Sequence, residues 1–260
     1  MAQSKELSKI RETGADMVSL LELSASPVGV KLVFENEKWE DDLSAEHLPH
    51  HRYCQAVMLA RHGRTVWLDA EGIACPAAAA AFGFKPLPEP LQSGKGLVGF
   101  GITSMPDVGK KMFQDMPRLD PGSIKGICLM PLESCSFTPD VIVVEDEVEK
   151  LMWVVLAYMH ATGGERVFGN TAVLQAACVD STLIPYLERR LNYGLSCYGC
   201  RDATDIKPGE ALVGFSGNWL SAIGEHLAYL SKKAIPGSRS KKAFHCLQRD
   251  DAGRDGGTCE

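Results

Sequence analysis

The chain has 260 residues, a formal net charge of −6, and 45% hydrophobic and 23% charged residues. This composition is typical of a soluble globular protein that is long enough to bury a sizeable core. The negative net charge gives no general attraction to nucleic acid or to an anionic membrane, and no apolar run approaches the roughly 20 residues that cross a bilayer. We therefore expect no nucleic-acid partner and no association with a membrane.

The first 26 residues predict an amphipathic helix, because acidic and basic side chains alternate there and no small-residue cleavage site follows. The absence of a leader peptide predicts a cytoplasmic protein. Strands and helices then alternate along the chain, which is typical of an α/β or α+β fold. The predicted strands are 27–35, 64–70, 96–101, 123–132, 139–147 and 210–217, and the predicted helices are 53–63, 75–84, 106–116, 147–161, 170–191 and 218–233.

An internal repeat runs through this order of elements. "PVGVKLVFENEK" at 27–38 is similar to "PDVIVVEDEVEK" at 139–150, and "GLVGFG" at 96–101 is similar to "ALVGFS" at 211–216. These landmarks favour an internal duplication, with chance similarity between short apolar strands as the alternative.

The duplication predicts two related α/β halves that pack about a pseudo-two-fold axis. We expect the first half at 27–116 and the second at 139–232. An N-terminal helix at 1–26, a connector at 117–138 and a flexible tail at 233–260 complete the predicted organisation.

Each predicted half carries two cysteines in the same order, Cys54 and Cys75 in the first half and Cys178 and Cys197 in the second. Equivalent residues converge where two-fold-related halves meet, so we expect these four thiols to face one another. The chain has nine cysteines in all, and in a reducing compartment metal binding, catalysis and simple burial compete for them. Burial on a helix is the alternative for Cys54 and Cys178, and Cys128, in an apolar strand, is expected in the core.

Four converging thiolates repel one another unless a cation holds them deprotonated. All-sulfur ligation favours zinc or an iron–sulfur cluster. Structural zinc sites usually combine two short motifs, whereas here only Cys197 and Cys200 form a Cys-x-x-Cys motif. We therefore expect a [4Fe–4S] cluster bound by Cys54, Cys75, Cys178 and Cys197, with Cys200 as a further metal ligand and zinc as the alternative cofactor.

Two local features bear on this expectation. Pro76 follows Cys75 and predicts a helix N-terminus at this thiol, which favours negative charge by about 0.3–1 kcal/mol. Arg61 and Arg201 each follow a cysteine-bearing segment, where they could offset the charge of an anionic cluster or bind an acidic substrate.

The same segments carry a resemblance to a known family. "YCQAVMLARHG", "CPAAAAAFGF", "SIKGICLMPLE", "PDVIVVEDE", "YMHATGGERVFGN" and "CYGCRDAT", spread over most of residues 20–232, resemble the domain of unknown function 169 (ArCR) family, found largely in archaea and anaerobic bacteria. The family has no established reaction, so the resemblance implies no substrate. It does imply cysteines at positions 54, 75, 178 and 197, with a variable residue at position 200, and an anaerobic setting suits an oxygen-sensitive cluster.

The sequence thus predicts a cytoplasmic iron–sulfur protein for electron transfer or redox chemistry in anaerobic metabolism. Its partner would be a redox protein or a small-molecule substrate. A zinc-stabilised module that binds a ligand or partner, and a thiol oxidoreductase that uses Cys197 and Cys200, stay open as alternatives. So do an enzymatic role, the oligomeric state, and ligation by Cys246 or Cys259 in the tail.

Overall fold

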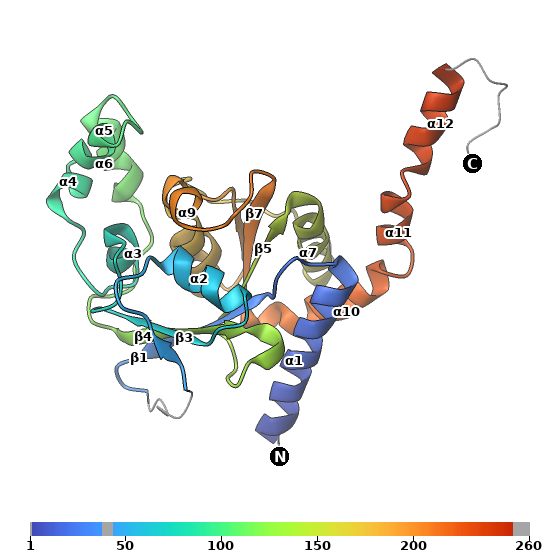
Figure 1. Cartoon of the computed structure of the whole chain (residues 1–260), viewed down its shortest axis with the longest axis horizontal. Helices are drawn as coiled ribbons and strands as arrows, with labels where there is room; N and C mark the ends of the chain where they lie inside the picture. The colour runs from blue at the N-terminus through green and yellow to red at the C-terminus, as the bar shows by residue number, and fades with distance from the viewer. Residues whose placement is uncertain (1, 38–43, 252–260) are drawn as a thin grey trace.

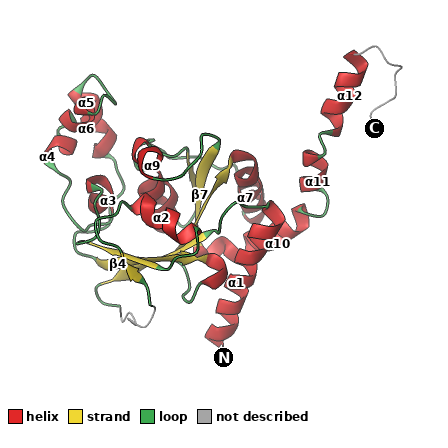
Figure 2. Ribbon diagram, in the orientation of Figure 1, coloured by secondary structure: helices red, strands yellow, loops and turns green. Residues whose placement is uncertain are grey.

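A computed structural model describes residues 2–37 and 44–251 of the chain. Its centre is a seven-stranded sheet in the order β2-β3-β4-β1-β5-β7-β6 with helices on both faces (Figure 1 and Figure 2). Neighbouring strands are antiparallel, except that β2 and β3 are parallel. The strands are β1 (Val28–Phe34), β2 (Glu46–His47), β3 (Val66–Asp69), β4 (Ile124–Pro131), β5 (Val141–Glu147), β6 (Leu191–Gly194) and β7 (Glu210–Ser216). The predicted mixed α/β class is confirmed.

The central strands are apolar on both sides, which is why the sheet is covered twice. Along β5, Val141 and Val143 pack into the core on one face, whereas Ile142 and Val144 pack into the core on the other. Successive side chains of a strand point to opposite faces, so a continuous apolar run requires helices above and below.

One face of the sheet, called here the pocket face, carries most of the short helices. They are α2 (Tyr53–Arg61), α3 (Pro76–Ala81), the π-helix η2 (Ala176–Leu183), α8 (Ile184–Glu188) and α9 (Tyr198–Ala203). Three further helices, α4 (Glu89–Gln92), α5 (Lys95–Gly99) and α6 (Pro106–Gln114), project beyond this layer (Figure 1).

The opposite face is covered by longer helices. They are α1 (Ala2–Leu21), α7 (Val148–Ala161) and α10 (Leu220–Leu230). The short 3₁₀ turns η1 (Leu132–Ser134) and η3 (Gly217–Trp219) also contribute to this layer. After α10, the helix α11 (Ala234–Arg239) packs on the body of the molecule through buried Ile235 and the ion pairs of Arg239 with Glu22 and Glu149, whereas α12 (Lys242–Asp251) extends away from it (Figure 1). In the part of the chain that the structure describes, no helix has both the length and the apolar character needed to span a bilayer.

The two sides of the sheet have the same arrangement of strands when each is read outward from the neighbouring strands β1 and β5. On one side lie β4 and then β3, and on the other side lie β7 and then β6. We call β1–β4 with α2–α6 the first half, and β5–β7 with α7–α10 the second half. The two halves share one continuous sheet, and their common origin by duplication stays a prediction.

The predicted strand at 96–101 is wrong, because this segment lies in and just after helix α5. Gly94 opens the helix with a left-handed φ of 75°, and a Cβ added at Gly109 of α6 would lie 2.7 Å from the Gly94 carbonyl oxygen. The two helices therefore touch through glycine backbone. The local sequence of this glycine-rich run fits a strand or a helix, and the contact favours the helix. The repeat landmark "GLVGFG" consequently has no strand to match "ALVGFS", which forms β7.

One helix differs in detail from its prediction. The helix expected over 170–191 begins only at Ala176, as η2, and ends with α8 at Glu188. The strand predicted at 123–132 is confirmed as β4, which lies within the segment 117–138 that was expected as a connector. The expected flexible tail at 233–260 contains α11 and α12, whereas Cys259 lies outside the described residues.

Candidate functional site

Cysteines from both halves line a single pocket on the pocket face, with a volume of about 250 Å³. They are all free thiols. The set contains every cysteine expected as a principal metal ligand together with the further ligand: Cys54, Cys75, Cys178, Cys197 and Cys200. Cys128, by contrast, is fully buried on the opposite face of the sheet, so its prediction as a core residue is confirmed.

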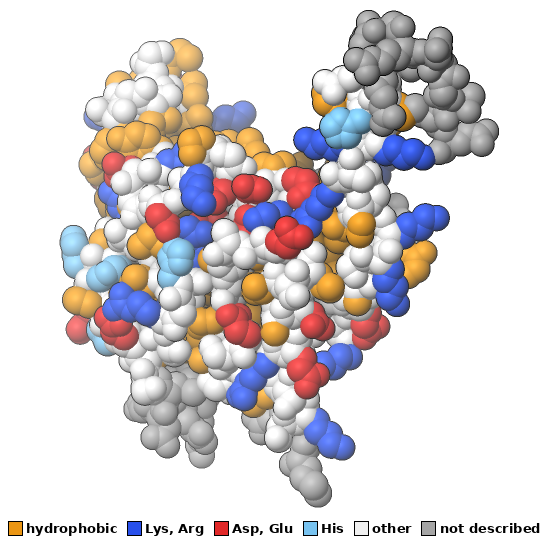
Figure 3. Space-filling view, turned by 45° about the vertical axis from the view of Figure 1, so that its right-hand side comes forward, with side chains coloured by type: hydrophobic (Ala, Val, Ile, Leu, Met, Phe, Trp, Pro, Cys, Tyr) orange, Lys and Arg blue, Asp and Glu red, His pale blue; other side chains and the backbone are white. Residues whose placement is uncertain are grey.

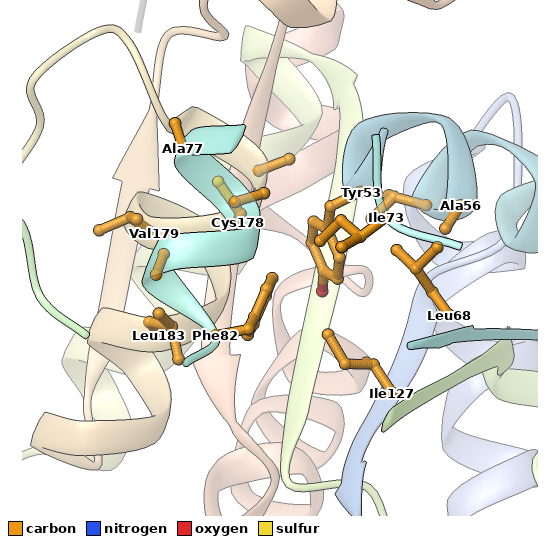
Figure 4. Close-up of a cluster of buried hydrophobic side chains, with 14 of the residues drawn as sticks. Tyr53, Ala56, Leu68, Ile73, Ala77, Phe82, Ile127, Cys178, Val179 and Leu183 are labelled. Atoms are coloured by element: carbon orange, nitrogen blue, oxygen red, sulfur yellow. The ribbon is translucent and has the colours of Figure 1, made fainter. Parts of the chain in front are cut away.

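The two halves present their thiols in similar ways. Cys54 is the second residue of α2, and Cys178 lies in the first turn of η2. Cys75 is the N-cap of α3, as Pro76 predicts, and Cys197 is the N-cap of α9. Each half therefore supplies one thiol from the start of a helix and one from an N-cap, and Figure 4 shows Cys178 beside Ala77 of α3.

The Cys-x-x-Cys motif forms a compact unit at one side of the pocket. The Sγ atoms of Cys197 and Cys200 are 3.1 Å apart, and the backbone N–H of Cys200 donates to Cys197 Sγ over 3.3 Å. Cys200 also shares a hydrogen bond with Cys54 of the first half. The motif thus joins the thiols of α9 to those of α2.

Backbone N–H groups at helix starts act on the pKa of the sulfur atoms. Those of Ala77 and Ala78 lower the pKa of Cys75, and those of the first two residues of η2 lower the pKa of Cys197 and of Cys200, in each case against larger influences that raise it. The first N–H groups of a helix have no partner within the helix, so they can stabilise negative charge on a thiolate.

Without a cation, the pKa values of Cys75, Cys178, Cys197 and Cys200 are raised. Burial raises the pKa of Cys75 and of Cys178, and the neighbouring thiols raise both further. The hydrogen bond that Cys197 donates to Cys200 is the largest cause of its raised pKa, followed by burial. For Cys200 that same bond lowers the pKa, but the bond with Cys54 and burial raise it to about 12. Four or five thiolates at this place therefore require a positive partner.

Arg52, the N-cap of α2, is a pocket residue that the sequence analysis did not single out. Its Nη1 donates to the Gly199 carbonyl and to Asp202 Oδ2, each over 3.0 Å, and so holds α2 against α9. Burial is the main influence on the pKa of Cys75, and the positive charge of Arg52 acts in the opposite direction. Its position two residues before Cys54 is the sequence feature that could have predicted a place in the pocket.

A buried hydrogen bond forms a second contact between the halves. Tyr53 Oη and Thr182 Oγ1 are 2.9 Å apart, and neither residue is more than 1% exposed. Thr182 also donates to the carbonyl of Ala177 over 2.8 Å. Figure 4 shows the Tyr53 ring within the surrounding apolar cluster, which includes Phe82. This bond fixes α2 against η2, the two elements that carry Cys54 and Cys178.

Helix η2 approaches the sheet unusually closely. A Cβ added at Gly214 of β7 would lie 1.8 Å from the carbonyl oxygen of Ser181, so only glycine permits this contact. π-Helices are rare and occur frequently at functional sites. Here the contact with Gly214 sets the depth at which η2 presents Cys178.

The two arginines expected near an anionic cluster have other roles. Arg61 is buried and pairs with Glu145, at 3.2 Å, and with Asp205. Arg201 donates to backbone carbonyls of Leu195 and Glu210. Neither residue lines the pocket.

Within the part of the chain that the structure describes, two buried polar atoms next to the thiols have no hydrogen-bond partner. They are Nε2 of Gln175, a residue that is 2% exposed and lines the pocket, and Oγ of Ser196, which is 1% exposed. Ser196 directly precedes Cys197 and has a positive φ of 72°, a strained conformation for a residue with a Cβ. Neither residue was predicted, although Gln175 is a polar interruption of the apolar run around it.

The projecting helices add an apolar wall to the pocket. Leu91 of α4, Leu97 of α5 and Phe113 of α6 are buried and line the pocket, joined by Phe100 and Ile102. Figure 3 shows hydrophobic side chains gathered on this projecting part of the surface. The lining of the pocket thus combines thiols with hydrocarbon side chains.

A site for a single metal ion needs several ligand atoms close to one point. Across 2–37 and 44–251, no group of three or more His, Cys, Asp or Glu side chains is arranged so that it could hold a metal ion. The thiols surround a pocket instead of converging on one point.

Comparison with known proteins gives a family but no activity. The family model described as uncharacterised ArCR, DUF169, matches residues 16–226. The uncharacterised protein MJ0308 of Methanocaldococcus jannaschii is 28% identical over 226 residues, which cover 86% of this chain and 96% of that protein. No solved structure matches the chain significantly. The chain therefore belongs to the domain of unknown function 169 family.

Proposed function

We propose that this protein binds one iron–sulfur cluster, of the [4Fe–4S] type, and serves electron transfer or redox chemistry in the cytoplasm. Cys54, Cys75, Cys178 and Cys197 would be its ligands, with Cys200 as a further or alternate ligand. The observation that carries the proposal is the meeting of these thiols, from four separate elements, around one pocket. When bound, such a cluster takes up and releases single electrons.

The donor set suits a cluster better than a single zinc ion. Zinc binds sulfur at about 2.3 Å, so its four ligands would lie within roughly 4 Å of one another. The described side chains contain no group placed for a single ion, whereas a cluster puts several iron atoms between its ligands. The N–H donors at the helix starts and the unpartnered hydroxyl of Ser196 are groups of the kind that hydrogen-bond to cluster sulfur.

A thiol oxidoreductase is the second candidate, favoured by the 3.1 Å separation of the Cys197 and Cys200 sulfurs. A reactive thiol needs a depressed pKa and access to solvent. The pKa values of both thiols are raised, and these residues are only 7% and 3% exposed. These properties favour ligation over exchange.

Anaerobic purification with reconstitution, followed by quantification of iron, inorganic sulfide and zinc in one sample, tests the proposal. We expect about four iron and four sulfide per chain. One zinc without sulfide would select the zinc-stabilised module. Protein without metal that forms a reversible Cys197–Cys200 disulfide, and that is unchanged by Cys54→Ser and Cys178→Ser, would select the oxidoreductase.

A further inference from the structure

The pocket is lined by two chemically different groups of side chains. The thiols lie at α2, α3, η2 and α9, whereas Leu91, Leu97 and Phe113 belong to the projecting helices. A cluster needs no hydrocarbon wall supplied by helices of its own. The volume of about 250 Å³ lies below the roughly 300–1,000 Å³ of pockets for drug-sized ligands, so the space beside the thiols suits a small molecule.

Gln175 gives this space a specific polar group. It is the N-cap of η2, lines this pocket, and also lines a neighbouring cavity of about 340 Å³. Its Nε2 is buried and has no partner, which costs stability unless an acceptor is supplied. The terminal torsion of glutamine is broad, so a small rotation directs the amide N–H into the pocket.

The groups around the pocket favour an uncharged ligand. Among the described residues that line it, Arg52 is the only one with a charged side chain apart from the thiols. Its Nη1 donates to the Gly199 carbonyl and pairs with the carboxylate of Asp202, which offsets the charge of the guanidinium. A carboxylate ligand would lie close to anionic sulfur, and an ammonium ligand would meet Gln175 with a donor facing a donor.

We propose that the pocket binds a small, uncharged aliphatic carbonyl compound beside the thiols. Its oxygen accepts a hydrogen bond from Gln175 Nε2, and its chain packs on Leu97 and its neighbours. The inference rests on the proposed function, because the ligand would lie next to the cluster and would be its substrate. Aldehydes, ketones, esters and amides share the required chemistry.

The test uses the full chain, reconstituted anaerobically, with three probes of equal chain length: butyramide, butyrate and butylammonium. Binding is measured by ligand-observed NMR titration, and iron and sulfide are quantified in every sample. We expect butyramide to bind most tightly. Gln175→Leu should weaken butyramide about three- to tenfold, the range for loss of one hydrogen bond. Gln175→Glu, which offers only acceptors, should reverse the preference toward butylammonium.

Two variants of α5 test the apolar wall. Leu97→Ala should weaken butyramide about fivefold, because the ligand chain loses buried apolar contact. The matched control Val98→Ala changes a half-buried neighbour that does not line the pocket, and it should leave binding unchanged.

The outcomes separate this inference from the proposed function. Full iron and sulfide without binding of butyramide would overturn the ligand and leave the cluster intact, as would tighter binding of butyrate. A Gln175→Leu variant with a shifted cluster reduction potential and unchanged butyramide binding would assign the amide to cluster sulfur instead. Absence of iron and sulfide would overturn the proposed function, whatever the probes do.

Discussion

The two halves of the sheet deliver similar thiols but differ in what joins the helix with a cysteine N-cap, α3 or α9, to their last strand. In the second half, a short loop at 204–209 connects α9 to β7. In the first half, residues 82–123 connect α3 to β4 and contain α4, α5 and α6. The elements that the halves have in common therefore carry the cysteines, whereas the apolar wall comes from one half alone. The comparison separates a shared metal-binding role from a ligand-binding role found on one side.

The largest effect is expected for equivalent cysteines of the two halves. Cys54→Ser and Cys178→Ser should each reduce bound iron at least fivefold, because each removes a ligand from one half. Cys128→Ala, on the opposite face, is the control and should keep its iron. Iron content after anaerobic reconstitution is the measurement. If only one of the two serine variants lost iron, the halves would not contribute equally.

The ion pair between the halves gives a pH-dependent prediction. Burial raises the pKa of Glu145 to about 7 from 4.5, against the effect of Arg61. The folded state binds this proton more tightly, so the stabilisation is complete below pH 4.5 and is lost as pH rises to about 7. The difference corresponds to about 3 kcal/mol in the free energy of unfolding.

Glu145→Gln should abolish this dependence, so that the stability of wild type and variant converges at acidic pH and diverges toward neutrality. Urea unfolding at several pH values measures it. A wild-type stability that increased from pH 4.5 to 7 relative to the variant would contradict the prediction.

One glycine in each half of the sheet lies against a close neighbour, and the two neighbours differ. At Gly214 of β7, an added Cβ would meet the Ser181 backbone oxygen at 1.8 Å, whereas at Gly126 of β4 it would meet the Trp67 ring at 2.2 Å. A side chain can rotate away more readily than a helix backbone can move. Gly214→Ala should therefore destabilise by about 2–3 kcal/mol and Gly126→Ala by about 1 kcal/mol in chemical denaturation. Equal losses would show that η2 is not held rigidly on β7.

A modest effect is expected at the hydrogen bond between α2 and η2. Thr182→Val leaves the buried Tyr53 hydroxyl without a partner and should cost about 1–2 kcal/mol in the free energy of unfolding. Tyr53→Phe removes the hydroxyl itself and should cost less, because Thr182 keeps its bond to Ala177. The reverse ranking would mean that the bond does not hold the halves together.

Much of the sheet could be predicted from local sequence. The runs that form β1, β4 and β5 are long, apolar and bounded by turn residues, so their character does not depend on distant contacts. The run at 96–101 is short and rich in glycine, and its helical form depends on the contact between Gly94 and Gly109. No local pattern reports such a contact.

The site was predictable to the extent that it repeats. Cys54 and Cys178, like Cys75 and Cys197, have equivalent positions in the two halves, so their convergence could be inferred from order alone. Gln175 has no counterpart of this kind, and its importance comes from a missing partner that only the folded structure reveals. The continuity of the sheet was also not predictable, because either edge of a strand can pair.

The ladder that joins the two halves is short. β1 and β5 share three residue pairs, whereas β1 and β4, like β5 and β7, share seven. Because fewer backbone bonds hold β1 to β5, we expect the sheet to open at this ladder before either group of strands unfolds. Cofactor insertion would then require a local breathing motion instead of synthesis-coupled folding. Amide hydrogen exchange in the apo protein should be faster at the β1–β5 ladder than at β5–β7, and insertion should slow it.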